Sequence, residues 1–329
     1  MTRVVLDAMG GDYAPDVPVE GALQAAAELA PSCEILLVGR QTEIEGALAK
    51  HGAPRDRFPI RDAPEVVGMG DKPLAAVRGK RKSSISVGLT LQKQGEADAF
   101  ISAGNTGAVM AASTLLLGLH PGVERAAIGT LFPTGDKPVL VLDAGANVDC
   151  SARELSGFAH LGAVYARDVL GRRNPAVGLL NIGEEEEKGN AVVKEAYGLL
   201  KDSPGFRFAG NVEGRDILAG EVDVVVCDGF VGNVVLKFYE SVGRLFLNLI
   251  EREMDRSVLD SPGMRTVFTI LDYAQYGGAP LLGIRGVSII CHGSSPARAI
   301  KNAIRVAMQS VDSHLSQHIG AEFAGGAVA

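Results

Sequence analysis

Six apolar segments of strand length are each followed by small polar residues and at least one glycine. In an open parallel sheet such loops share the carboxyl edge, where ligands bind. Turn formation alone explains any one of the loops, but all six together predict a common site. Their glycines and free backbone amides suit an anion. The loops read DAMGGD (7–12), SAGNTGA (102–108), DAGANVDC (143–150), NIGEEEEKGN (181–190), CDGFVGNVVLK (227–237) and CHGSS (291–295).

Several familiar catalytic motifs are missing. The sequence has no G-x-G-x-x-G, no P-loop, no H-E-x-x-H and no G-x-S-x-G, so dinucleotide, P-loop nucleotide, zinc and serine-nucleophile chemistry lack direct support. Cys291 and His292 are neighbours at a strand end, where consecutive side chains point to opposite faces, so we expect Cys291 in the core rather than in a dyad. What remains is amide, hydroxyl, Lys and His groups, which stabilise an oxyanion. This set suits transfer to an acceptor that is already nucleophilic and anionic, such as inorganic phosphate, with no cofactor and no metal.

The elements that must position these loops alternate between apolar strands and segments of helical period. We predict strands over residues 4–6, 35–38, 97–101, 127–132, 139–142, 176–181, 222–226 and 287–290. Continuous apolar strands alternating with helices predict a largely parallel sheet covered on both faces, in a three-layer α/β/α fold. We expect a single domain over residues 1–329, with a helical hairpin inserted at residues 238–273.

Composition excludes several classes of function. The chain has 329 residues and a net charge of −7, which argues against nucleic-acid binding. No apolar run reaches the length of a membrane helix, and the first residues enter a strand directly, so we expect a cytoplasmic protein. The four cysteines are far apart, which makes a disulfide framework unexpected.

The order of the motifs resembles that of the PlsX-type phosphate acyltransferases, from about residue 4 to about residue 310. The matching blocks are LDAMGGDYAPDVPVEGA, SAGNTGA, LDAGANVD, NIGEEEEKGN, GNVEGRD, DGFVGNVVLK, YGGAPLLG and HGSS. The resemblance implies a homodimer with an isocitrate/isopropylmalate-dehydrogenase-like fold. It also implies transfer of a long fatty acyl group from acyl carrier protein to inorganic phosphate, and the acyl phosphate then feeds glycerol-3-phosphate acylation at the start of phospholipid synthesis.

Three side chains are candidates for catalysis. Lys188 is expected to neutralise phosphate or the developing oxyanion, the alternative being a surface ion pair with Glu184. Asn233 is expected to donate its amide to a carbonyl or phosphate oxygen, the alternative being a helix cap. His292 is expected to protonate the leaving thiolate or to bind phosphate, the alternative being a structural histidine.

The glycine loops supply the candidates for phosphate or substrate binding. Because carboxylates repel phosphate, we expect the aspartates in these loops to orient Lys, Asn or backbone amides. The candidates are Gly10, Gly11, Asp12, Ser102, Gly104, Asn105, Thr106 and Asn147.

Two peripheral segments suggest partners. The cations Arg78, Lys80, Arg81 and Lys82 in RGKRKSS predict a docking patch for the acidic carrier protein, the alternative being a solvated helix end. In the family the hairpin is linked to dimerisation and membrane contact, which makes its Leu259 and Phe268 candidates for peripheral contact with the inner face of the membrane.

Two other classes of function stay open at this point. One is a short-chain phosphate acyltransferase or a dehydrogenase relative on the same scaffold, although the missing dinucleotide fingerprint counts against the dehydrogenase. The other is a catalytically silent scaffold that recruits carrier protein to membranes, against which the anion-suited loops argue. A downstream glycerol-3-phosphate acyltransferase is a further expected partner.

Overall fold

The computed structural model describes residues 1–134, 137–271 and 273–325. Within these residues one mixed sheet of eleven strands runs through the molecule in the order β3-β2-β1-β4-β11-β10-β5-β6-β9-β7-β8. The strands are β1 (Thr2–Asp7), β2 (Cys33–Gly39), β3 (Ile60–Asp62), β4 (Ala99–Ser102), β5 (Ala127–Phe132), β6 (Val139–Leu142), β7 (Ala176–Leu180), β8 (Arg207–Val212), β9 (Val224–Val226), β10 (Ala279–Leu282) and β11 (Val287–Ile290). All eight predicted strands are present; β3, β8 and β10 were not predicted.

Helices connect most of the strands. They are α1 (Asp16–Leu29), α2 (Gln41–Lys50), α3 (Pro73–Gly79), α4 (Ser84–Lys93), α5 (Thr106–Leu116), α6 (Ala152–Asp168), α7 (Ala191–Lys201), the 3-10 helix η1 (Gly214–Leu218), α8 (Gly229–Glu253), α9 (Arg256–Leu259), α10 (Pro262–Leu271), the 3-10 helix η2 (Tyr273–Tyr276), α11 (Ala297–Asp312) and α12 (Leu315–Ala324).

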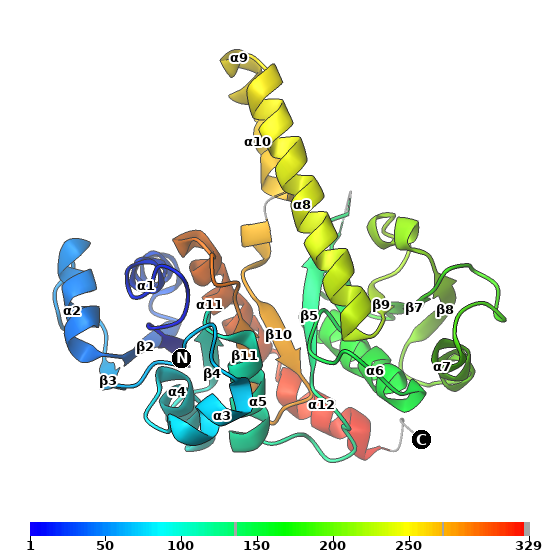
Figure 1. The fold of residues 1–329 in the computed structure, drawn as a ribbon, viewed down its shortest axis with the longest axis horizontal. Coiled ribbons are helices and arrows are strands. Elements are labelled where there is room, and N and C mark those ends of the chain that lie inside the picture. Colours follow the sequence, from blue (N-terminus) through cyan, green and yellow to red (C-terminus); the bar gives the residue numbers. More distant parts are fainter. Residues whose placement is uncertain (135–136, 272, 326–329) are drawn as a thin grey trace.

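Helices cover both faces of the half-sheet that contains β1 (Figure 1). Alternate residues of a strand point to opposite faces, and in β1 Val4 and Leu6 pack with α1, α2 and α11, whereas Val5 packs with α4 and α5. The other half is layered in the same way, with α6, α7 and α12 on one face and η1 and the base of α8 on the other. The predicted three-layer α/β architecture is therefore confirmed.

The direction of the strands differs from the prediction in one respect that matters for the site. Strand β10 is antiparallel to both β11 and β5, and β5 is antiparallel to β6. The remaining seven pairings are parallel. As a result, β6, β9 and β7 run opposite to β1, β4 and β11, and the six glycine loops do not share one edge of the sheet.

The loops of the two half-sheets nevertheless approach each other in the middle of the sheet. Ile290, at the end of β11, pairs with Ala279 at the start of β10. Leu142, at the end of β6, pairs with Gly129, whose neighbour Ile128 pairs with Leu281 of β10. The carboxyl ends of β11 and β6 therefore point toward each other, with β10 and β5 between the two strands.

The helical pair predicted at residues 238–273 projects from the body of the molecule (Figure 1). Helix α8 begins at Gly229, earlier than expected, and α9 and α10 form the tip and the returning arm. At the tip, Leu259 and Phe268 are half-buried, whereas Met254, Val258 and Val267 are exposed.

Candidate active site

A cavity of about 380 Å³ lies where the two half-sheets meet. Its residues come from α5, β5 and the residue after it, the loop after β6, α8, α10, the η2–β10 segment, and the end of β11 with the loop that follows it. The wall is formed by Thr106, Ile128, Thr130, Leu131, Phe132, Pro133, Ala144, Gly145, Asn233, Leu236, Lys237, Tyr239, Glu240, Ile270, Tyr276, Gly277, Gly278, Ala279, Ile290, Cys291, His292 and Ser295.

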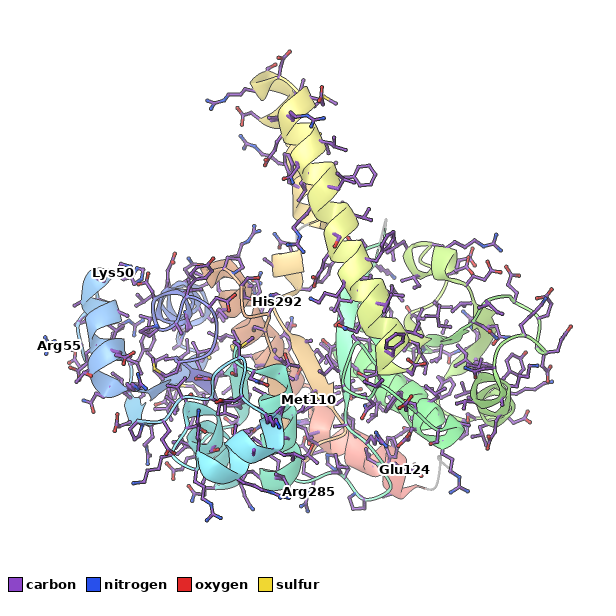
Figure 2. All side chains as sticks on the ribbon, viewed as in Figure 1. Lys50, Arg55, Met110, Glu124, Arg285 and His292 are labelled. Atoms are coloured by element: carbon purple, nitrogen blue, oxygen red, sulfur yellow. The ribbon has the colours of Figure 1, made fainter. Side chains whose placement is uncertain are left out.

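Three of the residues predicted for the site line this cavity together. Thr106 is the first residue of α5, Asn233 lies in the second turn of α8, and His292 follows β11. All three are exposed, and His292 lies near the centre of the molecule between the two halves (Figure 2). Loops from the two half-sheets therefore contribute to one cavity. They do so because the carboxyl ends of oppositely directed strands approach each other, and not because the loops share one edge of the sheet.

Close packing of the start of α8 brings Asn233 to the cavity. The carboxylate of Asp228 accepts a hydrogen bond from the Val231 amide at 2.8 Å and caps the helix, so Asn233 is not the cap. A Cβ on Gly232 would overlap the carbonyl oxygen of Asp143, so only glycine permits this approach. Asn233 itself packs against Gly145, whose φ of +129° favours glycine.

Hydrogen bonds within its own loop determine which nitrogen of the neutral His292 ring carries the proton. Its Nδ1 lies 2.8 Å from the Ser294 hydroxyl and accepts a hydrogen bond from the Ser294 amide at 3.3 Å. An amide always donates, so Nδ1 carries the lone pair and the proton of the neutral ring sits on Nε2. This tautomer donates to an oxyanion, which favours the phosphate-binding alternative for His292 over protonation of a thiolate.

Cys291, the neighbour of His292, is only 2% exposed, in agreement with the prediction that it belongs to the core. Burial raises the pKa of its thiol to about 12. The thiol is therefore protonated at neutral pH and unsuited to nucleophilic attack.

The loops after β1 and β4 bind each other. The Asp7 carboxylate accepts hydrogen bonds from the Ser102 hydroxyl at 2.7 Å and from the Met9 amide at 3.0 Å, and burial raises the pKa of this carboxyl. Ser102 in turn accepts from the Gly104 amide. A Cβ on Gly10 would lie 2.7 Å from the Gly104 nitrogen, so the contact requires glycine. These polar groups satisfy one another, and Gly10, Ser102 and Gly104 do not line the cavity, so the cavity gives no support to their predicted role in binding phosphate.

Gly11 and Asp12 connect the same loop to the segment after β11. The Asp12 amide donates to the carbonyl oxygen of Gly293 at 2.8 Å, and Gly11, with a φ of +108°, lies against the same oxygen. Neither residue lines the cavity. Their contacts support the segment that carries His292 instead of contacting the cavity themselves.

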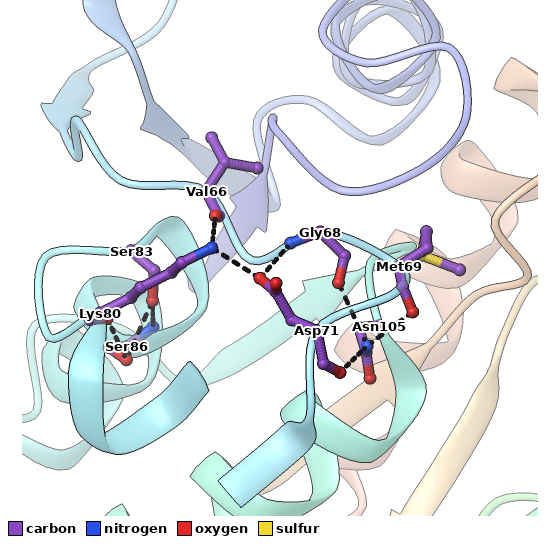
Figure 3. A network of polar contacts seen from close by, with 8 residues as sticks. All are labelled: Val66, Gly68, Met69, Asp71, Lys80, Ser83, Ser86 and Asn105. Atoms are coloured by element: carbon purple, nitrogen blue, oxygen red, sulfur yellow. Dashed lines mark hydrogen bonds and ion pairs between the residues drawn. The ribbon is translucent and has the colours of Figure 1, made fainter. Parts of the chain in front are cut away.

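Asn105 also has a structural role (Figure 3). Its side-chain oxygen accepts from the Ala108 amide and caps α5, while its NH₂ group donates to the carbonyl oxygens of Gly68, Met69 and Asp71. Both ends of the Asn105 amide are therefore engaged within the chain, and these contacts favour the capping alternative over phosphate binding by this side chain.

Lys80 holds the other end of the same loop. Its ammonium group lies 2.5 Å from the Asp71 carboxylate and 2.9 Å from the carbonyl oxygen of Val66 (Figure 3). The hydrogen bond from Lys80 lowers the pKa of Asp71. Of the four cations predicted to dock the carrier protein, Arg78, Arg81 and Lys82 are exposed, whereas the charge of Lys80 is paired within the chain.

Asn147 likewise contacts its own loop. Its NH₂ group donates to the carboxylate of Asp143 at 2.9 Å and to the carbonyl oxygen of Ala126 at 2.8 Å. The Asp143 carboxylate also accepts from the amides of Ile128 and Ala146, and burial raises its pKa, an effect that these donors oppose. Asp143 therefore orients backbone amides as predicted, and Asn147 does not line the cavity.

Lys188 is not brought to the cavity. It follows β7, which is separated from β6 by β9, and its exposed ammonium group lies 4.0 Å from the Glu185 carboxylate. The predicted alternative of a surface ion pair therefore describes Lys188 better, with Glu185 as the partner in place of Glu184, which pairs with Arg215.

Sequence reasoning missed several polar residues of the cavity wall, of which Lys237 and Ser295 bear most directly on anion binding. Lys237 supplies a cation there and forms an ion pair with Glu240 at 2.9 Å. Ser295 supplies a hydroxyl. Both lie within motifs that the sequence singles out, DGFVGNVVLK and CHGSS. Helical spacing from Asn233 is a signal by which Lys237 could have been found, because residues four apart share a face.

Within the described part of the chain, no helix is both long and apolar enough to cross a membrane.

Comparison with known proteins identifies the family. A family model described as "Fatty acid synthesis protein" matches residues 2–318. The phosphate acyltransferase of Heliobacterium modesticaldum is 51% identical, with 96% of this chain and 97% of that protein covered.

Two solved structures have a similar fold. A phosphotransacetylase from Streptococcus pyogenes superposes with a TM-score of 0.65 at 19% identity, and the EutD phosphotransacetylase from Staphylococcus aureus with 0.64 at 15%. Each match covers 94% of both chains. The full-length family match and the 51% identity together establish that this chain belongs to the phosphate acyltransferase family and is an acyltransferase.

Proposed function

We propose that the protein transfers a long-chain fatty acyl group from acyl carrier protein to inorganic phosphate, and that the acyl phosphate feeds a glycerol-3-phosphate acyltransferase in phospholipid synthesis. The observation that carries the proposal is the mixed character of the cavity wall. Thr106, His292 and Asn233 supply polar groups to it. Its apolar side chains include Leu131, Phe132, Leu236, Ile270 and Ile290.

The transfer needs no covalent enzyme intermediate. A phosphate oxygen attacks the thioester carbonyl carbon, the carbon–sulfur bond breaks, and the carrier thiolate leaves. A thiolate is a good leaving group near neutral pH, so the step does not require His292 to give up a proton. The Nε2–H of His292 and the side-chain amide of Asn233 are suited to hydrogen-bond phosphate or the carbonyl oxygen as charge develops.

The apolar wall favours a long acyl chain over a short one. Each buried methylene contributes about 0.8 kcal/mol, and an acetyl group has no chain to place against Leu131, Phe132 and Leu236. A short-chain phosphate acyltransferase is therefore the weaker candidate.

The exposed cations Arg78, Arg81 and Lys82 remain our proposed docking patch for the acidic carrier protein. They lie at and beyond the end of α3, next to the loop that Lys80 and Asn105 hold in place. Opposite charge steers encounter and weakens with salt.

Helix α8 is proposed to support a homodimer and membrane contact. One series of large apolar side chains along it is exposed, namely Phe230, Val231, Val234, Phe238, Leu245 and Phe246. A second copy of the chain would bury such a surface. At the tip, Met254, Val258 and Val267 are better placed than Leu259 and Phe268 for peripheral contact with the inner face of the membrane, because they are more exposed.

The proposed activity is tested by incubating the protein with palmitoyl-carrier protein and phosphate and trapping acyl phosphate as hydroxamate with hydroxylamine. We expect hydroxamate that depends on phosphate and much less with acetyl-carrier protein. A signal no higher than the phosphate-free control would favour a non-catalytic scaffold. Equal rates with both donors would favour the short-chain alternative.

A further inference from the structure

Ser295 carries a buried hydroxyl with no hydrogen-bond partner in the described structure. The residue is 3% exposed, and its Oγ is fully shielded from solvent. A buried hydroxyl without a partner costs free energy, so native proteins rarely keep one without a reason. Because Ser295 lines the cavity, the missing partner fits a bound ligand.

The hydroxyl lies at the start of a long helix. Helix α11 begins two residues later and runs for 16 residues. Its cap residue, Pro296, makes no side-chain capping hydrogen bond. The first amides of a helix and its macrodipole favour an anion. The turn is fixed by the Ser295 amide, which donates to the His292 carbonyl oxygen at 2.9 Å.

Other polar groups near this point are also donors. His292 presents Nε2–H, because its Nδ1 accepts from the Ser294 amide. Lys237 adds a cation to the cavity wall, although the carboxylate of Glu240 partly offsets it. By contrast, the polar side chains of Ser102, Asn105 and Asn147 are satisfied within their own loops.

We infer that inorganic phosphate binds at the N-terminus of α11, where the Ser295 hydroxyl and the Nε2–H of His292 donate hydrogen bonds to its oxygens. The inference rests on the proposed function for its choice of phosphate among oxyanions. It places the phosphate at the loop after β11, whereas most of the residues predicted from the sequence to bind phosphate lie in the loops after β1 and β4. A phosphate held there lies in the same cavity as Asn233 and the apolar wall.

The test compares wild type with Ser295→Ala and with Ser310→Ala, a control on the same helix. Ser310 is equally buried, but its hydroxyl donates to the Val306 carbonyl oxygen within α11. Binding of inorganic phosphate alone is measured by isothermal titration calorimetry on the full chain, and melting temperature is measured in phosphate-free buffer.

For Ser295→Ala we expect a phosphate Kd about 10-fold higher, as for the loss of one hydrogen bond to a charged group. We also expect an unchanged or higher melting temperature without phosphate, since the variant removes an unpartnered polar atom. A merely structural hydroxyl would give the opposite thermal result. Ser310→Ala is expected to leave the phosphate Kd unchanged.

Kinetic measurements distinguish a Ser295 that binds phosphate from a Ser295 that binds the carbonyl oxygen of the thioester. They also separate the inference from the proposed function. We expect Ser295→Ala to raise the KM for phosphate and to leave the KM for the acyl donor unchanged. A lower kcat with an unchanged phosphate Kd would assign Ser295 to the carbonyl oxygen and overturn the inference. Because calorimetry needs no acyl donor, a weakened phosphate Kd would support the inference even if palmitoyl-carrier protein proved not to be the donor.

Discussion

Two glycines of α8 give a matched test of how the helix positions Asn233. An alanine Cβ at Gly232 would come well inside the 3.0 Å that real Cβ atoms keep from a neighbouring atom, here the carbonyl oxygen of Asp143. To relieve the overlap, the start of α8 must move by about 1 Å, and a misplacement of that size in a reacting group costs about 100-fold in rate. Overpacking of this kind also lowers the free energy of unfolding by about 1–3 kcal/mol.

Gly243, in the same helix, has no atom within 4 Å of the Cβ it would carry as alanine. Gly243→Ala should therefore raise the free energy of unfolding by up to about 1 kcal/mol, because alanine is the better helix former. Both variants are assayed by urea unfolding and by kcat/KM for hydroxamate formation. If Gly232→Ala retained wild-type kcat/KM, the placement of Asn233 by this contact would be refuted.

The other predictions concern a buried carboxylate, a buried histidine and the surface cations. Asp143→Asn should lower the free energy of unfolding by about 3 kcal/mol, because an NH₂ group then faces amide donors. Burial lowers the pKa of His160, so as the pH falls the unfolded chain takes up a proton on His160 before the folded chain does. The free energy of unfolding should therefore be highest above pH about 6.5 and should decrease below it by at most about 1.4 kcal/mol per pH unit. His160→Gln should flatten this pH dependence, as measured by urea unfolding at a series of pH values. Neutralising Arg78, Arg81 and Lys82 together should raise the KM for acyl-carrier protein several-fold at low salt and leave that for acyl-CoA unchanged.

Each of these has a clear contrary outcome. An Asp143→Asn protein as stable as wild type would mean that the hydrogen bonds from backbone amides to the Asp143 carboxylate do not stabilise the loop. Parallel pH profiles for wild type and His160→Gln would assign the pH dependence to other groups. Equal changes in KM for both donors would exclude the cation patch as a carrier-protein contact.

The sequence predicted the layers of the fold well because strand and helix periodicity are local signals. Val4, Val5 and Leu6 are all apolar because helices cover both faces of the sheet, and a continuous apolar run reports this burial directly. The reversal of strand direction was not predictable in the same way. It arises where β6 pairs antiparallel with β5, and an apolar strand does not report the direction of its neighbour. Strand β10 was missed because its four residues include Pro280, and proline argues against a strand in a sequence.

Local signals in the sequence indicated only some of the residues that line the cavity. Residue type and position after a strand pointed to Thr106, Asn233 and His292, which do meet. The same signals pointed to Ser102, Asn105 and Asn147, whose polar atoms the fold uses internally. Only tertiary contacts distinguish an amide that faces a cavity from one that caps a helix. Lys188 lies outside the cavity wall because its strand, β7, is separated from β6 by β9.

The most direct test of the central claim is a crystal structure of the protein with inorganic phosphate. Our account predicts phosphate in the cavity between the half-sheets, within hydrogen-bond distance of His292 Nε2 and on the same wall as Thr106. Phosphate bound instead against Lys188, or on the loop at Gly10 and Gly11 with the cavity empty, would contradict it.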